Sequence, residues 1–145
     1  AHERPGRCDV KVGRGGLTDV EFIVQYLQMA HGGNPSVRTP ETVAAIEALE
    51  AAGTLDTSHA AILRDAYRFI RRIEQRIRVV HNARVSLLDE GAPGVRAVAR
   101  SMGFRDGPGR RAEDQLFSRY QAVASEVRTV FCEVLGVPEL ELQGS

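Results

Sequence analysis

Apolar side chains recur at intervals of three and four residues along most of the chain, whereas the alternation typical of strands is nearly absent. This spacing brings side chains to one face of an α-helix, so the pattern predicts helices rather than strands. Five helices are expected, over residues 18–31, 39–52, 57–82, 93–102 and 111–135.

The third and fifth of these helices are the longest and carry the most regular apolar faces. The third has one apolar row and a second row that widens it: Ile62, Ala66, Phe69, Ile73, Ile77 and Val80, with Leu63, Tyr67 and Ile70 beside them. A face this wide predicts a central helix that is contacted from several sides. The fifth carries an apolar row at alternating steps of four and three residues, which suits packing along another long helix. The row is Leu116, Tyr120, Val123, Val127, Val130 and Val134. The expected fold class is therefore all-α, an irregular helical bundle of about five helices, two of them long.

Several helix ends carry recognisable signals. We expect Thr39 to cap the second helix and Pro40 to occupy its first turn, where the missing N–H of proline costs nothing. Gly53 should end that helix, because glycine tolerates the left-handed conformation of a helix C-terminus. Thr18 and Glu21 have the three-residue separation of a capping box at the start of the first helix.

Composition narrows the class of protein without identifying it. The formal net charge is zero, which argues against a general polyanion-binding surface. Two cysteines far apart in sequence match no metal-ligand spacing and favour a reducing, cytoplasmic location. No apolar run approaches the roughly 20 residues of a membrane span. Of the basic residues, eighteen are Arg and one is Lys, so Lys11 stands out as the one compact ammonium group.

The densest cluster of unusual residues lies at 11–22, where a glycine-rich loop leads into the first helix. Gly13, Gly15 and Gly16 let the backbone approach a ligand closely, and the N–H groups at a helix amino end attract anions. Lys11 and Arg14 add positive charge, so these five residues are candidates for contacting a nucleotide phosphate. The loop is not a P-loop, because no Gly-Lys-Ser/Thr closes it, and a dinucleotide fingerprint would need a preceding strand.

A purely structural interpretation of the same segment stays open. The glycines can serve a sharp turn alone, and a capping box explains Glu21 without any function. Asp19 can simply favour the helix dipole. It lies about 200° around the helix from Glu21, so the two carboxylates cannot bind one metal ion together through this helix. No metal site is expected.

Residues 9–25 carry a specific family resemblance. They read Asp-Val-Lys-Val-Gly-Arg-Gly-Gly-Leu-Thr-Asp-Val-Glu-Phe-Ile-Val-Gln. This resembles the Lys-x-Gly-x-Gly-Gly signature, continued by (Asp/Glu)-(Ile/Val)-Glu-Phe, of bifunctional glutamine-synthetase adenylyltransferase/adenylyl-removing enzymes. PII uridylyltransferases carry a looser version. Residues 37–42 and 63–74 agree with the same family, so the resemblance extends over most of the chain, from Cys8 to Gly136.

The resemblance implies a helical domain that follows a nucleotidyltransferase core in a two-halved enzyme. One half transfers AMP from ATP to glutamine synthetase and the other removes it, under control by glutamine and the PII signalling protein. The core would hold ATP and Mg²⁺ and carry the catalytic residues. Nothing in residues 1–10 matches the core, so this chain is expected to be inactive alone and to contain no catalytic residue. Which half it follows stays open.

On this interpretation, residues 1–10 are a linker from the missing core, 11–136 the helical domain and 137–145 a C-terminal tail. The domain would be regulatory or partner-docking, with glutamine synthetase, PII and the core of the same chain as partners. Lys11 and the loop at 13–16 would lie against the nucleotide phosphates or the edge of the core. The alternative is a stand-alone helical interaction module without a catalytic role.

The third helix is rich in arginine, and part of it is a candidate docking flank. Four of its arginines fall near one side, where an acidic partner or nucleic acid could bind: Arg64, Arg68, Arg71 and Arg78. The alternative is a solvated face with ion pairs to acids of the second and fifth helices. Tyr67 and Phe69 fit the core better than a base-stacking platform, which argues against nucleic acid.

Overall fold

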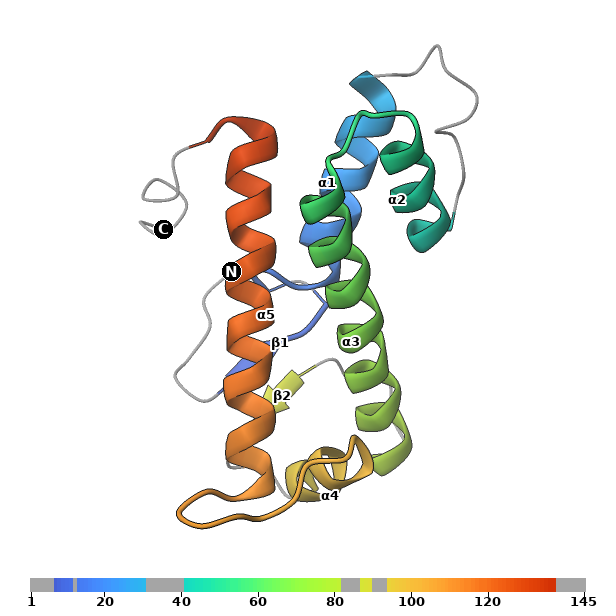
Figure 1. Cartoon of the computed structure of the whole chain (residues 1–145). Coiled ribbons are helices and arrows are strands. Elements are labelled where there is room, and N and C mark those ends of the chain that lie inside the picture. Colours follow the sequence, from blue (N-terminus) through green and yellow to red (C-terminus); the bar gives the residue numbers. More distant parts are fainter. Residues whose placement is uncertain (1–6, 12, 31–40, 82–86, 90–93, 138–145) are drawn as a thin grey trace.

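The computed structural model describes residues 7–11, 13–30, 41–81, 87–89 and 94–137, most of them in helices (Figure 1). In chain order the elements are β1 (Arg7–Asp9), α1 (Leu17–Ala30), α2 (Thr42–Ala51), α3 (Thr57–His81), β2 (Leu87–Asp89), α4 (Val95–Ser101) and α5 (Ala112–Leu135). Each predicted helix is present, and apart from the start of α2 the predicted ends lie within two residues of the observed ones. The all-α class is confirmed.

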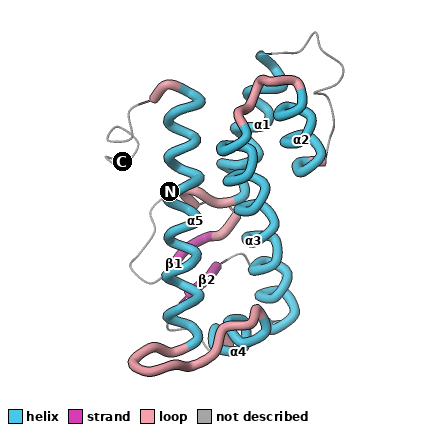
Figure 2. Tube along the Cα trace, in the orientation of Figure 1, coloured by secondary structure: helices cyan, strands magenta, loops and turns pink. Residues whose placement is uncertain are grey.

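The two long helices form the frame of the molecule. α3 and α5 run antiparallel, α1 lies beside them, α2 covers one end of α3, and α4 crosses the other end (Figures 1 and 2). α3 contacts α1, α2, α4 and α5, which confirms the prediction of a central helix.

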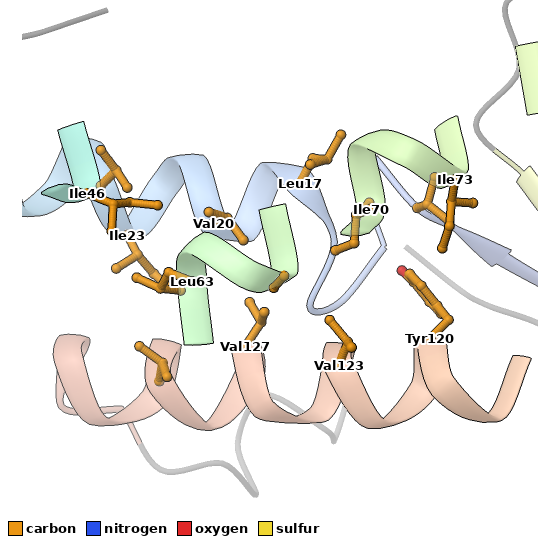
Figure 3. Packing of buried hydrophobic residues seen from close by; sticks show 14 of the residues in the cluster. Leu17, Val20, Ile23, Ile46, Leu63, Ile70, Ile73, Tyr120, Val123 and Val127 are labelled. Atoms are coloured by element: carbon orange, nitrogen blue, oxygen red, sulfur yellow. The ribbon is translucent and has the colours of Figure 1, made fainter. Parts of the chain in front are cut away.

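One apolar core joins these helices. In Figure 3, Val123 and Val127 of α5 face Leu63 and Ile70 of α3, and Val20 of α1 points into the same core from the opposite side. The predicted seam of α5 is buried except for Val134, which is only partly buried. On α3 the buried row is Leu63, Ala66, Ile70, Ile73 and Ile77. The predicted main row, from Ile62 to Val80, is partly at the surface, and Val80 is 36% exposed. The core is therefore centred closer to Leu63 and Ile70 than predicted.

A short antiparallel ribbon was not predicted. β1 pairs with β2 in the register Arg7 with Asp89, Cys8 with Leu88 and Asp9 with Leu87. Strands of three residues are too short to show an alternating pattern. Val10, directly after β1, is fully buried. Residues 7–10, which the sequence assigns to a linker, thus pair and pack with the rest of the described chain.

The ends of α2 give one correction and one confirmation. The helix begins at Thr42, and Glu41 occupies the position before it in an extended conformation. Thr39 and Pro40, the predicted cap, lie outside the described residues, as do the linker at 1–6 and the tail at 138–145. Gly53 follows α2 with φ of 78°, the left-handed conformation expected for it.

Candidate functional site

The glycine-rich loop folds back on the chain that precedes it. The N–H of Gly16 donates to the carbonyl of Gly13 at 2.9 Å, and that of Leu17 to the carbonyl of Val10 at 3.0 Å. The N–H of Thr18 donates to the carbonyl of Lys11 at 2.8 Å. The N–H groups of Gly16, Leu17 and Thr18 are thus already bonded within the chain, and they could bind a phosphate only by breaking these bonds.

Two glycines of the loop are required by close contacts inside the domain. Gly15 has φ of 75°, and a Cβ there would lie 2.2 Å from the carbonyl oxygen of Ala124 on α5. A Cβ on Gly16 would lie 2.7 Å from the carbonyl oxygen of Val10. Gly13 is buried as well. The close approach predicted for these glycines is real, but the structure places α5 and the preceding chain there instead of a ligand.

Asp19 ties this loop to α5. Its Oδ2 accepts the N–H of Gly15 at 2.6 Å and the Nη1 of Arg128 at 2.7 Å. The side chains of Asp19 and Arg128 are 17% and 16% exposed, so the ion pair is largely shielded from water. The Arg128 guanidinium also lies 4.3 Å from the ring centroid of Phe131, which contacts Phe22 at 5.8 Å between centroids. Asp19 therefore does more than favour the helix dipole.

The ion pair of Arg128 with Asp19 was not predicted from the sequence. Nothing in the pattern of α5 distinguishes it from the other arginines, because its partner lies 109 residues away along the chain. Only the parallel packing of α1 and α5 brings the two side chains together.

Thr18 and Glu21 do not form the predicted capping box. α1 begins at Leu17, so Thr18 already lies within the helix. In a capping box the Glu21 carboxylate would accept the N–H of Thr18, and the carbonyl of Lys11 accepts it instead. Thr18 is exposed and Glu21 half-buried.

Lys11 combines a fixed backbone with an exposed side chain. Its N–H donates to Oδ1 of Asp9 at 3.0 Å, and its carbonyl accepts from Thr18. The side chain itself is exposed, whereas Arg14 in the same loop is half-buried. The loop thus presents one ammonium group to solvent from a residue whose backbone N–H and carbonyl are both hydrogen-bonded.

The predicted arginine flank of α3 is partly occupied by intramolecular ion pairs. Arg64 lies 3.5 Å from Glu50 of α2, and Arg71 lies 2.5 Å from the buried Glu74. The pair of Arg64 is one of the interhelical pairs that the alternative interpretation expected. Arg68 and Arg78 are exposed.

Among the described residues, no three His, Cys, Asp or Glu side chains come together as a metal site would require. His59 instead lies between carboxylates, with Nε2 3.1 Å from Glu133 of α5 and Nδ1 3.3 Å from Asp56. The hydrogen bond from the backbone N–H of His59, followed by that from Ser58, lowers the pKa of Asp56. These contacts fasten the start of α3 to the end of α5.

No helix in the described part of the chain is long and apolar enough to cross a bilayer.

Comparison with known proteins gives a family. The family model described as GlnD PII-uridylyltransferase matches residues 2–135. Three relatives share the name bifunctional glutamine synthetase adenylyltransferase/adenylyl-removing enzyme. The one from Xanthobacter autotrophicus is 38% identical over 87% of this chain and 13% of its own length. Those from Streptomyces avermitilis and Streptomyces coelicolor are 42% and 43% identical over 69% and 68% of this chain, and 10% of each relative.

The chain thus spans about a tenth of the length of these curated relatives. No solved structure matches it. The resemblance carried by residues 9–25 is confirmed by the names of the relatives and by the model that covers nearly the whole sequence. The chain belongs to the GlnD PII-uridylyltransferase family.

Proposed function

We propose that this chain is the helical domain of a glutamine-synthetase adenylyltransferase/adenylyl-removing enzyme. There it would support nucleotidyl transfer and serve as a docking surface for the nucleotidyltransferase core and for partner proteins. The longer enzyme would transfer AMP from ATP to glutamine synthetase and remove it again. The names of the relatives support this proposal, since they describe an adenylyltransferase of glutamine synthetase and an adenylyl-removing enzyme. The observation that carries the supporting role is the exposed Lys11 on an anchored loop.

The anchoring matters because electrostatic stabilisation of a phosphoryl group depends on charges that are already in place. The loop behind Lys11 is fixed against α5 by the contact of Gly15 with Ala124 and by the pair of Asp19 with Arg128. Because the N–H groups of the three loop glycines are bonded within the chain, the charge of Lys11, with Arg14 beside it, would act on the phosphates.

The cofactors belong to other parts of the longer enzyme. The described residues bring together no carboxylate cluster that fits Mg²⁺, so no step through the metal is assigned to this chain. Only the cationic side chains of the loop suit ATP, through its phosphates. We therefore propose that the nucleotidyltransferase core holds ATP and Mg²⁺ and that this chain alone is inactive.

One face of α1 supports docking against that core. Phe22, Tyr26 and Met29 are 48%, 43% and 82% exposed and follow one another at steps of four and three residues. They therefore form one apolar stripe on the helix that starts at the Lys11 loop. A core that covers this stripe would bring its nucleotide site close to Lys11. Glutamine synthetase and PII stay proposed partners without residues assigned to them.

The test replaces Lys11 in the full-length enzyme with methionine, which keeps the length of the side chain but not its charge, and separately with arginine. We expect Lys11→Met to lower kcat for adenylylation of glutamine synthetase about 100-fold, at the lower end of the range for loss of one preorganised donor. Lys11→Arg should restore part of that loss, and KM for glutamine synthetase should change little. The exposed Arg110→Gln on the loop before α5 is the control for removal of one positive charge.

Parent-like kinetics for Lys11→Met would contradict the supporting role and favour the interaction module. Far-ultraviolet circular dichroism of each variant separates a kinetic effect from loss of fold.

A further inference from the structure

Most arginines in the described part of the chain have an intramolecular partner. Those with a carboxylate within 4.0 Å are Arg64, Arg71, Arg96, Arg100, Arg111 and Arg128. Arg105 donates instead to backbone carbonyls. Pairing is therefore common among these arginines, and the described ones without an ion pair or hydrogen bond are all exposed: Arg68, Arg72, Arg76, Arg78, Arg110 and Arg119.

Three of these exposed arginines lie together on the outward side of α3. Arg68, Arg72 and Arg76 are exposed, and the described residues supply none of them with an ion pair or hydrogen bond. They follow one another at four-residue steps, so they line one side of the helix about 6 Å apart along its axis. We call these three residues the arginine ridge. Val79, 75% exposed, continues it by one turn.

The arginine ridge is unfavourable for the helix by itself. Like charges four residues apart repel each other, and here two such pairs follow in sequence without a carboxylate between them on that side. A bias of the composition towards arginine explains why these cations are not lysines. It does not explain why three of them line one side of α3, where Asp65 lies before all three and no described carboxylate stands between them.

We propose that the arginine ridge is a docking surface for a protein partner that presents a row of carboxylates on a helix. Guanidinium groups bind carboxylates through paired N–H donors, and a helix with acids at four-residue steps repeats the spacing of the ridge. Val79 adds an exposed apolar contact next to the charges, as protein interfaces do.

A nucleic acid fits this surface less well. Stacking platforms for bases need exposed aromatic rings, and Tyr67 and Phe69, the aromatic residues of α3, are packed against the core. The surface also differs from the flank predicted by the sequence, because Arg64 and Arg71 are engaged with Glu50 and Glu74. It involves neither Lys11 nor its loop, so it stands apart from the proposed nucleotide role.

The experiment measures binding of the 145-residue chain to a fluorescein-labelled helical peptide with Glu at every fourth position over three turns. Fluorescence anisotropy gives the affinity at low salt, and the same peptide with Gln in place of Glu tests the charge. The ridge variant is Arg72→Gln/Arg76→Gln. The matched control, Arg110→Gln/Arg119→Gln, removes the same charge from exposed positions before and on α5.

We expect the Glu peptide to bind and the ridge variant to weaken its affinity about three- to tenfold, as the loss of two exposed ion pairs would. The control should change affinity less than twofold, and the Gln peptide should not bind. The ridge variant should melt no lower than the parent, because it loses only repulsive pairs.

Three results would overturn the proposal. The first is a failure of the Glu peptide to bind, and the second is equal weakening of binding by both double variants, which would mean attraction to net charge. The third is tighter, ridge-dependent binding of a single-stranded oligonucleotide of equal charge, which would reassign the surface to nucleic acid.

Discussion

Single residues in the glycine loop show how the same pattern can serve a ligand or the fold. Gly15 and Gly16 were identified from sequence as places of close backbone approach, and close approach is what the structure has. The sequence could not specify what approaches them, because the backbone of Ala124 reaches Gly15 only through the packing of α5 on α1. For the same reason, the sequence located Asp19 but not its partner Arg128.

Gly15→Ala should therefore destabilise the domain through two effects at once. The left-handed φ costs a non-glycine residue about 1–2 kcal/mol, and overpacking against Ala124 adds about 1–3 kcal/mol. We expect the free energy of unfolding in urea, followed by circular dichroism, to fall by about 2–5 kcal/mol. Gly53→Ala is the control, since its φ is 78° but its Cβ would meet nothing within 4 Å. Equal losses in the two variants would show that contact with α5 is unimportant.

Helices were predictable because their signal is local, whereas the connections between elements were not. The apolar spacing of α3 and α5 extends over 25 and 24 residues, enough to fix their positions and nearly all of their ends. The ribbon of β1 and β2 has three residues a strand and depends on pairing between distant segments. The contacts of Asp106 between α4 and α5 are equally invisible in sequence, since a loop aspartate carries no pattern of its own.

Asp106 makes the junction of α4 and α5 sensitive to acid. It accepts the N–H of Ala112, the first residue of α5, at 2.9 Å, and it also pairs with Arg96 and Arg100 of α4. The hydrogen bond from Ala112, helped by Arg100 and Arg96, lowers the pKa of Asp106 below its ordinary value of 3.8. Its contribution to stability is thus complete above pH 3.8 and is lost as pH falls through the lower folded-state pKa.

Asp106→Asn keeps an oxygen for Ala112 but removes the titration and the charge that Arg96 and Arg100 contact. The parent should be more stable than the variant at neutral pH. We expect this difference to stay constant down to about pH 4 and to shrink below it. Urea unfolding at a series of pH values measures the difference. A difference that persists unchanged to pH 2.5 or below would show that the carboxylate is not held in its charged form by these partners.

At the scale of the whole molecule, zero net charge conceals a separation of charge. Residues 66–119 contain twelve Arg and six Asp or Glu, while the rest of the chain contains seven basic and thirteen acidic residues. The described part of this basic segment comprises the second half of α3, α4 and the start of α5, which lie together at one end of the bundle (Figure 1). The sum of charges argues against a uniform polyanion-binding surface, but the arginine ridge becomes visible only when charges are placed on the fold.

The same central helix that carries the ridge should make the domain unfold as one unit. Leu63 packs near α1, and Ile73 packs near Tyr120 in the first half of α5 (Figure 3). Both are fully buried on α3, which contacts all the other helices. Leu63→Ala and Ile73→Ala should each lower the free energy of unfolding by about 2–5 kcal/mol, because each leaves a cavity in a shared core.

Since the two sites belong to one cooperative structure, each variant should shift a single urea transition to a lower midpoint with an unchanged slope. Circular dichroism and tyrosine fluorescence should report the same midpoint for each variant. Two separate transitions, with Leu63→Ala lowering one and Ile73→Ala the other, would show that the two ends of α3 belong to independent cores.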